Sequence, residues 1–346
     1  MRVGVLAIFS LAAAGCALLV SLDDLGDGSV DAAEGGSDVV SFDDAADVVD
    51  ADAGAAPVVL ANNRAAPHDL QLDPPYVVWI EDPPPVSLVV RYDTTSQLTP
   101  KVEATSLAGE IYRGLAADAT KHQLFWTRTG AVNALVECRT ALCNAQDIAQ
   151  ADGGQLAKVI IEPGTTYWEH AAGICAVHIY ATDRDSGATA VFHDACEYNT
   201  IASDGTSLWY ESFIGTLAGS SFASDASVTT KLPGTIAAST IHGEWYLFGT
   251  GAVDGSVYAC ALPTCPDAAL ATGQAAPIAF AADDNAIYWI NAGSGAGNDG
   301  SLVTCAATGP CTPNVLVSGI DHPTSIAIDA TYIYYTDASN ILRLAR

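Results

Sequence analysis

Apolar and polar residues follow a repeated pattern between residues 57 and 346. The clearest copies are PTSIAIDATYIYY at 323–335 and PIAFAADDNAIYW at 277–289, which both fit Pro-x5-Asp-x5-aromatic. The same frame fits, with substitutions, segments that begin at residues 67, 112, 156, 198 and 233, and the copy at 112 carries two extra residues. Successive copies begin 45, 44, 42, 35, 44 and 46 residues apart. Seven copies at a similar spacing indicate a repeat architecture.

Each copy predicts a set of β-strands. A short apolar stretch precedes the Asp, whose carboxylate suits a tight turn, and a segment rich in aromatic and β-branched residues follows it. Two more strand-like segments complete a copy, such as 301–305 and 314–318 in the copy that begins at 277. Four short strands in about 42 residues have the size of one propeller blade.

The ends of the repeat region predict how the ring closes. The last copy stops at Arg346 after three strands, and an apolar segment, Val58–Ala61, precedes the first copy. That segment can supply the fourth strand of the last blade, so that the closed ring leaves only short sheet edges. We therefore predict an all-β fold, with a seven-bladed β-propeller over residues 57–346. Six or eight blades would also fit the pattern.

Two residue types have a fixed place in the copies. Small residues recur in the first strand, at Ala116, Ala202, Ala237 and Ala327, which suits strands crowded around an axis. The repeated Trp and Tyr could form a sugar-binding platform. Their constant position favours the core of the blades instead.

The first residues predict export. Arg2 precedes an uncharged apolar run, Val3–Ala14, which has the length of a secretory signal core. Ala13-Ala14-Gly15-Cys16 then resembles a bacterial lipobox, with Ala13 where Leu is usual. We predict a signal peptide over residues 1–16 and acylation of Cys16. Ordinary signal cleavage near Ala14, or an uncleaved span over 3–22, are the alternatives.

Acidic residues dominate the next segment and the whole chain. Residues 17–56 contain 11 Asp and Glu and no Lys or Arg, which predicts an extended, disordered tether. A calcium loop among Asp47, Asp50 and Asp52 lacks the Gly and the terminal Glu of that motif. The chain carries a net charge of −27, and nucleic acid is excluded as a partner because phosphate binding needs clustered Lys and Arg. We expect a monomer in the cell envelope, held at the outer membrane or cell surface by its lipid anchor, or secreted.

Eight Cys remain after Cys16, and an exported chain meets an oxidising compartment. We expect four disulfides inside single blades. A zinc site is disfavoured because no His spacing completes a tetrahedral set. The expected pairs are Cys138–Cys143, Cys175–Cys196, Cys260–Cys265 and Cys305–Cys311.

Two motifs carry a resemblance to known propellers. Tyr334-Tyr335-Thr336-Asp337 and Ile287-Tyr288-Trp289-Ile290-Asn291 look like the Tyr-Trp-Thr-Asp repeats of receptor propellers, and more loosely like other extracellular six-bladed propellers. The resemblance implies a fold and a habit of binding, but no particular ligand. Receptor propellers have six blades and accompany small disulfide modules, whereas this chain has seven copies and no such modules.

Polar residues follow the repeat aromatics and define a candidate binding face. We expect them on the face opposite the disulfides, and an ordinary solvated rim is the alternative. They are Glu81, Arg128, Glu169, His170, Glu211, Asn291 and Asp337.

The leading hypothesis is a membrane-tethered propeller that binds a protein, a glycan or an envelope component without catalysis, cofactor or metal. The alternative is an exported propeller enzyme of the metal-dependent lactonase or lyase type. That enzyme would need Glu81, Glu169, Glu211, Asn291 and Asp337 to converge at the axial channel. A nucleophile motif of the Gly-x-Ser-x-Gly type between strand and helix is not found.

Overall fold

A computed structural model describes the repeat region of the chain, from residue 56 onward. The described residues are 56–346 except 97, 139–142, 172–176, 196–197, 213–215, 223–226, 233–235, 244, 252–253, 266–267 and 308–310. The predicted signal peptide with Cys16, nearly all of the 17–56 tether, and the Cys175–Cys196 pair lie outside the described residues and stay predictions. Within the described part, no helix is long and apolar enough to cross a bilayer.

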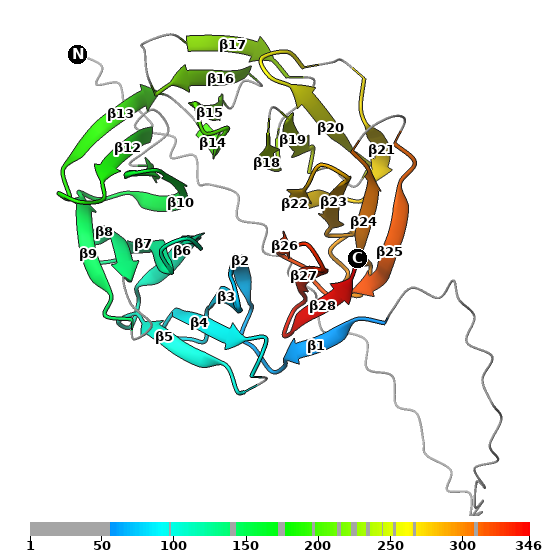
Figure 1. The fold of residues 1–346 in the computed structure, drawn as a ribbon, viewed down its shortest axis with the longest axis horizontal. Coiled ribbons are helices and arrows are strands. Elements are labelled where there is room, and N and C mark those ends of the chain that lie inside the picture. Colours follow the sequence, from blue (N-terminus) through cyan, green and yellow to red (C-terminus); the bar gives the residue numbers. More distant parts are fainter. Residues whose placement is uncertain are drawn as a thin grey trace, which may run out of the picture. The chain divides into compact units, whose positions relative to one another are not determined.

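Strands alone form the fold in this part of the chain, as seven antiparallel four-stranded sheets set around a ring (Figure 1). The prediction of an all-β, seven-bladed propeller is confirmed. Blades 1 to 3 are β2 (His68–Asp73), β3 (Tyr76–Glu81), β4 (Leu88–Asp93), β5 (Lys101–Thr105); β6 (Ile111–Asp118), β7 (Gln123–Thr129), β8 (Asn133–Cys138), β9 (Gln146–Ala151); and β10 (Gln155–Glu162), β11 (Thr165–Ala171), β12 (Val177–Asp183), β13 (Thr189–Ala195).

The remaining blades repeat this order. Blades 4 to 7 are β14 (Tyr198–Ser203), β15 (Ser207–Ser212), β16 (Thr216–Ser221), β17 (Ser227–Lys231); β18 (Ala238–His242), β19 (Trp245–Gly249), β20 (Gly255–Ala261), β21 (Ala271–Gln274); β22 (Pro277–Ala282), β23 (Ala286–Asn291), β24 (Gly300–Ala306), β25 (Asn314–Ile320); and β26 (Ile326–Ile328), β27 (Tyr332–Thr336), β28 (Ile341–Ala345), β1 (Val58–Ala61).

The N-terminal strand closes the ring. β1 pairs antiparallel with β28, with Val58 opposite Arg343 and Val59 opposite Leu342, and the two strands lie side by side in Figure 1. The backbone N–H of Arg64 adds a hydrogen bond of 2.8 Å to the carbonyl of Ser339. The expectation that Val58–Ala61 completes the last blade is therefore confirmed.

The repeat Asp caps the turn between the first and second strands. The Oδ1 atom of Asp329 accepts hydrogen bonds from the backbone N–H groups of Thr331 and Tyr332, both at 2.7 Å. Asp118, Asp204 and Asp283 cap their turns in the same way. This local bond is the physical reason why an Asp recurs at a fixed place in the sequence.

The repeat aromatics fill the blades. Trp79, Trp126, Trp168 and Trp289 are fully buried, each on the second strand of its blade. The structure thus confirms that these side chains form the core rather than a sugar platform.

Blade 5 departs from the sequence frame. The repeat aromatic, which is the fourth residue of the second strand, is the fully buried Phe248 in β19, and Tyr246 of the same strand is also fully buried. Trp245 begins the strand and is 47% exposed. The copy therefore starts at Ile236, not at residue 233, and His242 stands in the place of the Asp that caps the turn in blades 2, 4, 6 and 7. The assignment of Trp245 to the core was wrong because two aromatic residues lie three positions apart and strand position decides which one is buried.

Three disulfides lie on one face of the ring. Cys138–Cys143, Cys260–Cys265 and Cys305–Cys311 each join the end of a third strand to the loop that leads into the fourth. Because adjacent strands run in opposite directions, these loops share a face with the turns between first and second strands. We call this the stapled face.

Candidate functional site

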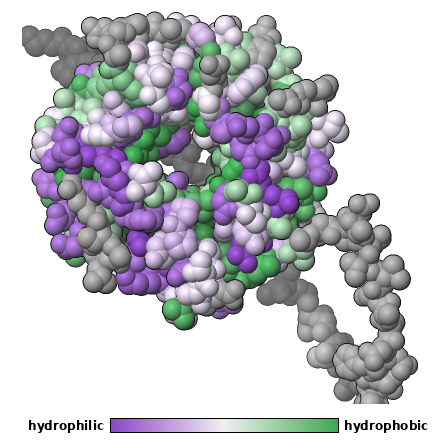
Figure 2. Space-filling view, in the orientation of Figure 1, coloured by the Kyte–Doolittle hydropathy of each residue, from purple (hydrophilic) through white to green (hydrophobic). Residues whose placement is uncertain are grey.

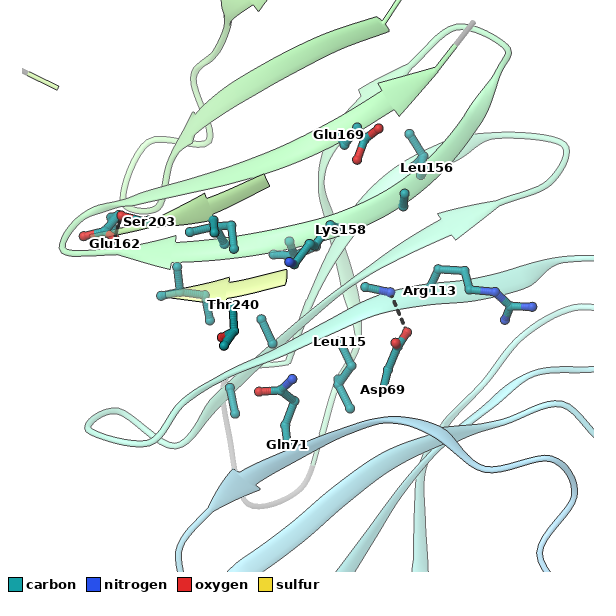
Figure 3. Close-up of a pocket in the computed structure, with 18 of the residues that line it drawn as sticks. Asp69, Gln71, Arg113, Leu115, Leu156, Lys158, Glu162, Glu169, Ser203 and Thr240 are labelled. Carbon is teal, nitrogen blue, oxygen red and sulfur yellow. Dashed lines mark hydrogen bonds between the residues drawn. The ribbon is translucent and has the colours of Figure 1, made fainter. Parts of the chain in front are cut away.

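The innermost strands of blades 1 to 5, together with Glu169 of β11, line a cavity of about 770 Å³. We call it the axial cavity. The space-filling view shows the ring hollowed at its centre (Figure 2). The lining includes small side chains such as Ala116 and Ala202 on the first strands. The polar and charged residues of the lining are Asp69, Gln71, Arg113, Gln155, Lys158, Glu162, Glu169, Ser203 and Thr240, many of which are labelled in Figure 3.

A β-bulge places two of these charges opposite each other. In blade 3, Leu156 pairs with His170 and Val159 pairs with Trp168, so Ala157 and Lys158 together oppose Glu169. Innermost strands β2, β6, β14 and β22 carry a register shift near the same place. Bulges redirect side chains, and here they bring polar groups to the cavity.

The electrostatics of Lys158 and Glu169 follow from this placement. Burial raises the pKa of Glu169 to about 7, although the ammonium of Lys158 opposes the rise. Burial also lowers the pKa of Lys158 to about 8, against the attraction of Glu169 and Asp69. Both groups can therefore exchange protons near neutral pH, a property that is common at functional sites.

Asp69 contributes a fixed negative charge. Its backbone is left-handed, with φ of 51°, and its Oδ2 atom accepts a 2.8 Å hydrogen bond from the backbone N–H of Gly114 (Figure 3). Burial alone would raise the pKa of Asp69, but His68, the Gly114 N–H and Arg113 together lower it.

Gly114 has φ of 64°, and a Cβ atom there would lie 1.9 Å from the carbonyl oxygen of Ala157. Only glycine fits.

Arg113 belongs to a second polar group beside the cavity. Its Nη1 atom donates a 2.8 Å hydrogen bond to Oδ2 of Asp82, which also lies 3.2 Å from Nε2 of His68. The side chain of Arg113 is 41% exposed. The guanidinium is thus held in place while part of it stays accessible.

Two residues of the predicted binding face are buried in ion pairs or hydrogen bonds of their own. Glu81 is 2% exposed; it accepts a 2.9 Å hydrogen bond from Arg64 and a 2.6 Å hydrogen bond from Nε1 of Trp79. Asn291 is 5% exposed and donates to Oε1 of Gln274 at 3.1 Å.

The other members of that face are also held locally. Arg128 donates to Asp147 at 2.7 Å, and His170 is buried with its Nε2 atom against the Gly153 carbonyl. Asp337 caps its own loop through the backbone N–H of Asn340. The side chain of Glu211 lies outside the described residues. Of the six residues whose side chains the structure describes, only Glu169 lines the cavity, and the role of the set in binding stays a prediction.

Sequence reasoning missed Asp69, Arg113 and Lys158. A signal was present, because these charges lie one or two places after the start of their copies, where the copies that begin at 277 and 323 carry uncharged residues. Within the described part of the chain, no group of three or more His, Cys, Asp or Glu is placed to hold a metal ion.

No protein-family model matches the chain, and no curated protein matches it. Solved structures with a similar fold include virginiamycin B lyase from Staphylococcus aureus, with a TM-score of 0.62 and 13% identity over 84% of this chain and 98% of that chain. A catalytically inactive form of the same lyase with quinupristin gives 0.62 and 14% over the same shares. The computationally designed Ika8 protein gives 0.57 and 12%, over 83% of this chain and 98% of that chain. At these identities, the likeness shows the propeller fold alone.

Proposed function

We propose that this chain is an exported, membrane-tethered propeller that binds a glycan or another polar component of the cell envelope, or a protein that presents such a group, in its axial cavity without changing it. The observation that carries the proposal is the cavity of about 770 Å³ with charges of both signs on its wall. A volume of this size holds a small molecule or the end of a larger one.

Rigidity supports a binding role. The walls of the cavity are mainly the innermost strands of four-stranded blades in a closed ring. The side chains of Asp69 and Arg113 are fixed by hydrogen bonds. A preorganised site loses less conformational entropy when a ligand binds. The disulfides of the stapled face are typical of an exported protein.

A glycan array probed with the purified full chain tests this proposal. We expect a restricted set of glycans to bind, with affinity reduced about tenfold or more in Lys158→Met, because a charged partner in the cavity is lost. Leu107→Ala is the matched control, since Leu107 is 72% exposed on a loop and does not line this cavity. Binding that is unchanged in Lys158→Met would place the ligand elsewhere.

The second candidate function is an exported enzyme of the lyase type. The observation that favours it is the pair Lys158 and Glu169, since one group can take a proton near neutral pH while the other returns it. Mass spectrometry of each bound glycan after prolonged incubation separates the two functions. A product that forms with wild type and not with Lys158→Met would establish catalysis and overturn the binding proposal.

A further inference from the structure

A second cavity, of about 510 Å³, lies between blades 5 and 6. Its lining is mainly apolar and includes Leu247, Leu270 and Ile287, which belong to the hydrophobic cluster shared by these two blades. Trp245 also lines it and remains 47% exposed. The cavity is therefore an apolar recess with an accessible aromatic ring in its wall.

Blades 1 and 7 show what covers an aromatic ring at this place in the repeat. Their second strands begin with Tyr76 and Tyr332. The guanidinium carbon of Arg91 lies 4.7 Å from the ring centroid of Tyr76, and that of Arg343 lies 4.3 Å from the ring centroid of Tyr332. In both blades, an arginine of the third strand thus makes a cation–π contact.

Strand register identifies the matching position in blade 5. Arg91 is opposite the third residue of β3, Arg343 is opposite the third residue of β27, and Ala259 is opposite Leu247, the third residue of β19. Trp245 begins β19, as the two tyrosines begin their strands. Ala259 has no side chain that could reach over Trp245, and it lines the cavity instead. Blade 5 keeps the aromatic ring of this arrangement and replaces its cation by open space.

Two carboxylates lie beside the cavity, each next to a basic partner of its own. The side chain of Asp284 is 97% exposed and pairs with Nε2 of His242 at 2.9 Å. Asp283 lines the cavity, pairs with Arg346, and accepts a 2.8 Å hydrogen bond from the backbone N–H of Asn285. The net charge of −27 further raises the local concentration of cations around the whole protein.

We propose that this cavity binds a small organic cation, with its ammonium or guanidinium group over Trp245 and its apolar body in the recess. The ligand's cation would occupy the place that Arg91 and Arg343 fill in their own blades. The site is separate from the axial cavity, because the two linings have no residue in common. Blade 5 contributes only Thr240 and Ile241 of β18 to the axial cavity.

Isothermal titration of the full chain with 2-phenylethylammonium, and with 3-phenylpropionate as the anion of similar shape, tests this site. We expect the cation to bind more tightly than the anion. Trp245→Ala should weaken cation binding about tenfold, the effect of losing one desolvated cation–π contact. Ala259→Arg should abolish binding, because it rebuilds the intramolecular contact of blades 1 and 7. Leu107→Ala should bind as wild type does.

Three results would overturn the proposal. They are equal affinity for the two probes, unchanged cation binding in both Trp245→Ala and Ala259→Arg, and no detectable binding of the cation to wild type at millimolar concentration. Circular dichroism of each variant reports whether it folds. If Ala259→Arg does not fold, Trp245→Ala decides the location by itself, because Trp245 is half exposed and its removal leaves the buried cluster intact.

Discussion

Replacing Glu169 by Gln should make the protein more stable at neutral pH. Glu169 is 6% exposed, and burial raises the pKa of its carboxyl from 4.5 to about 7. Between these two pH values, the native state keeps a proton that the unfolded chain has released. The free energy of unfolding of wild type therefore falls as pH rises through this window.

The magnitude follows from the size of the shift. A rise from 4.5 to about 7 corresponds to about 3 kcal/mol at 1.36 kcal/mol for each pKa unit. Gln resembles the protonated carboxyl and does not ionise. Below pH 4.5 we expect variant and wild type to be nearly equal in stability, and at pH 7.5 we expect the variant to be more stable by up to about 3 kcal/mol. The attraction to Lys158 is already contained in this figure, because the pKa of about 7 is the value that remains after that attraction has opposed the effect of burial.

Urea unfolding followed by circular dichroism at pH 4.5 and pH 7.5 measures the difference. Glu81→Gln is the matched control, because Glu81 is equally buried on a second strand but is paired with Arg64 and with Nε1 of Trp79. That substitution should destabilise the protein at pH 7.5. If Glu169→Gln lowers stability at pH 7.5 as Glu81→Gln does, the carboxylate of Glu169 is satisfied in the native state and the reasoning is refuted.

Three more predictions concern the ring and its anchor. Gly114→Ala should lower the free energy of unfolding by about 2–4 kcal/mol, because of left-handed backbone strain and a clash with Ala157. Gly109→Ala, at φ of 85° with open space around it, should lower it by about 1 kcal/mol. Equal losses of stability in thermal melts of the two variants would contradict the clash with Ala157. Deleting residues 57–62 removes β1 and should lower the melting temperature by several degrees, and an unchanged value would show that closure adds nothing. A fatty-acid probe should label wild type and not Cys16→Ser, and equal labelling of both would exclude acylation at this residue.

The blades could be predicted from sequence because their signals are local. In blades 2, 4, 6 and 7, the Asp of the copy accepts hydrogen bonds from backbone N–H groups only two or three residues ahead. A turn and its following strand are therefore specified within about a dozen residues. The start of the copy in blade 5 was predicted wrongly, because Trp245 and Phe248 can both be read as the repeat aromatic. Only burial in the assembled sheet distinguishes them.

The axial cavity could not be predicted in the same way. Glu169 meets Lys158 through a bulge, which shifts the pairing by one residue and leaves no mark in the apolar pattern. Glu81 looked like a rim residue because its partner Arg64 lies 17 positions earlier, outside any copy. Contacts between segments distant in sequence decide which polar residues line the cavity and which ones form ion pairs or hydrogen bonds inside the blades.

Ring closure through β1 also constrains the order in which the protein can assemble. A ribosome delivers residue 58 early and its partner, residue 343, almost at the end, so the first strand made is among the last to be paired. Six blades can form while the chain is still emerging, but the seventh waits for β28. Until then, the leading strand has an unsatisfied edge that could pair with another molecule. The protein is thus most exposed to aggregation before β28 has been made, because the ring closes only in this late step.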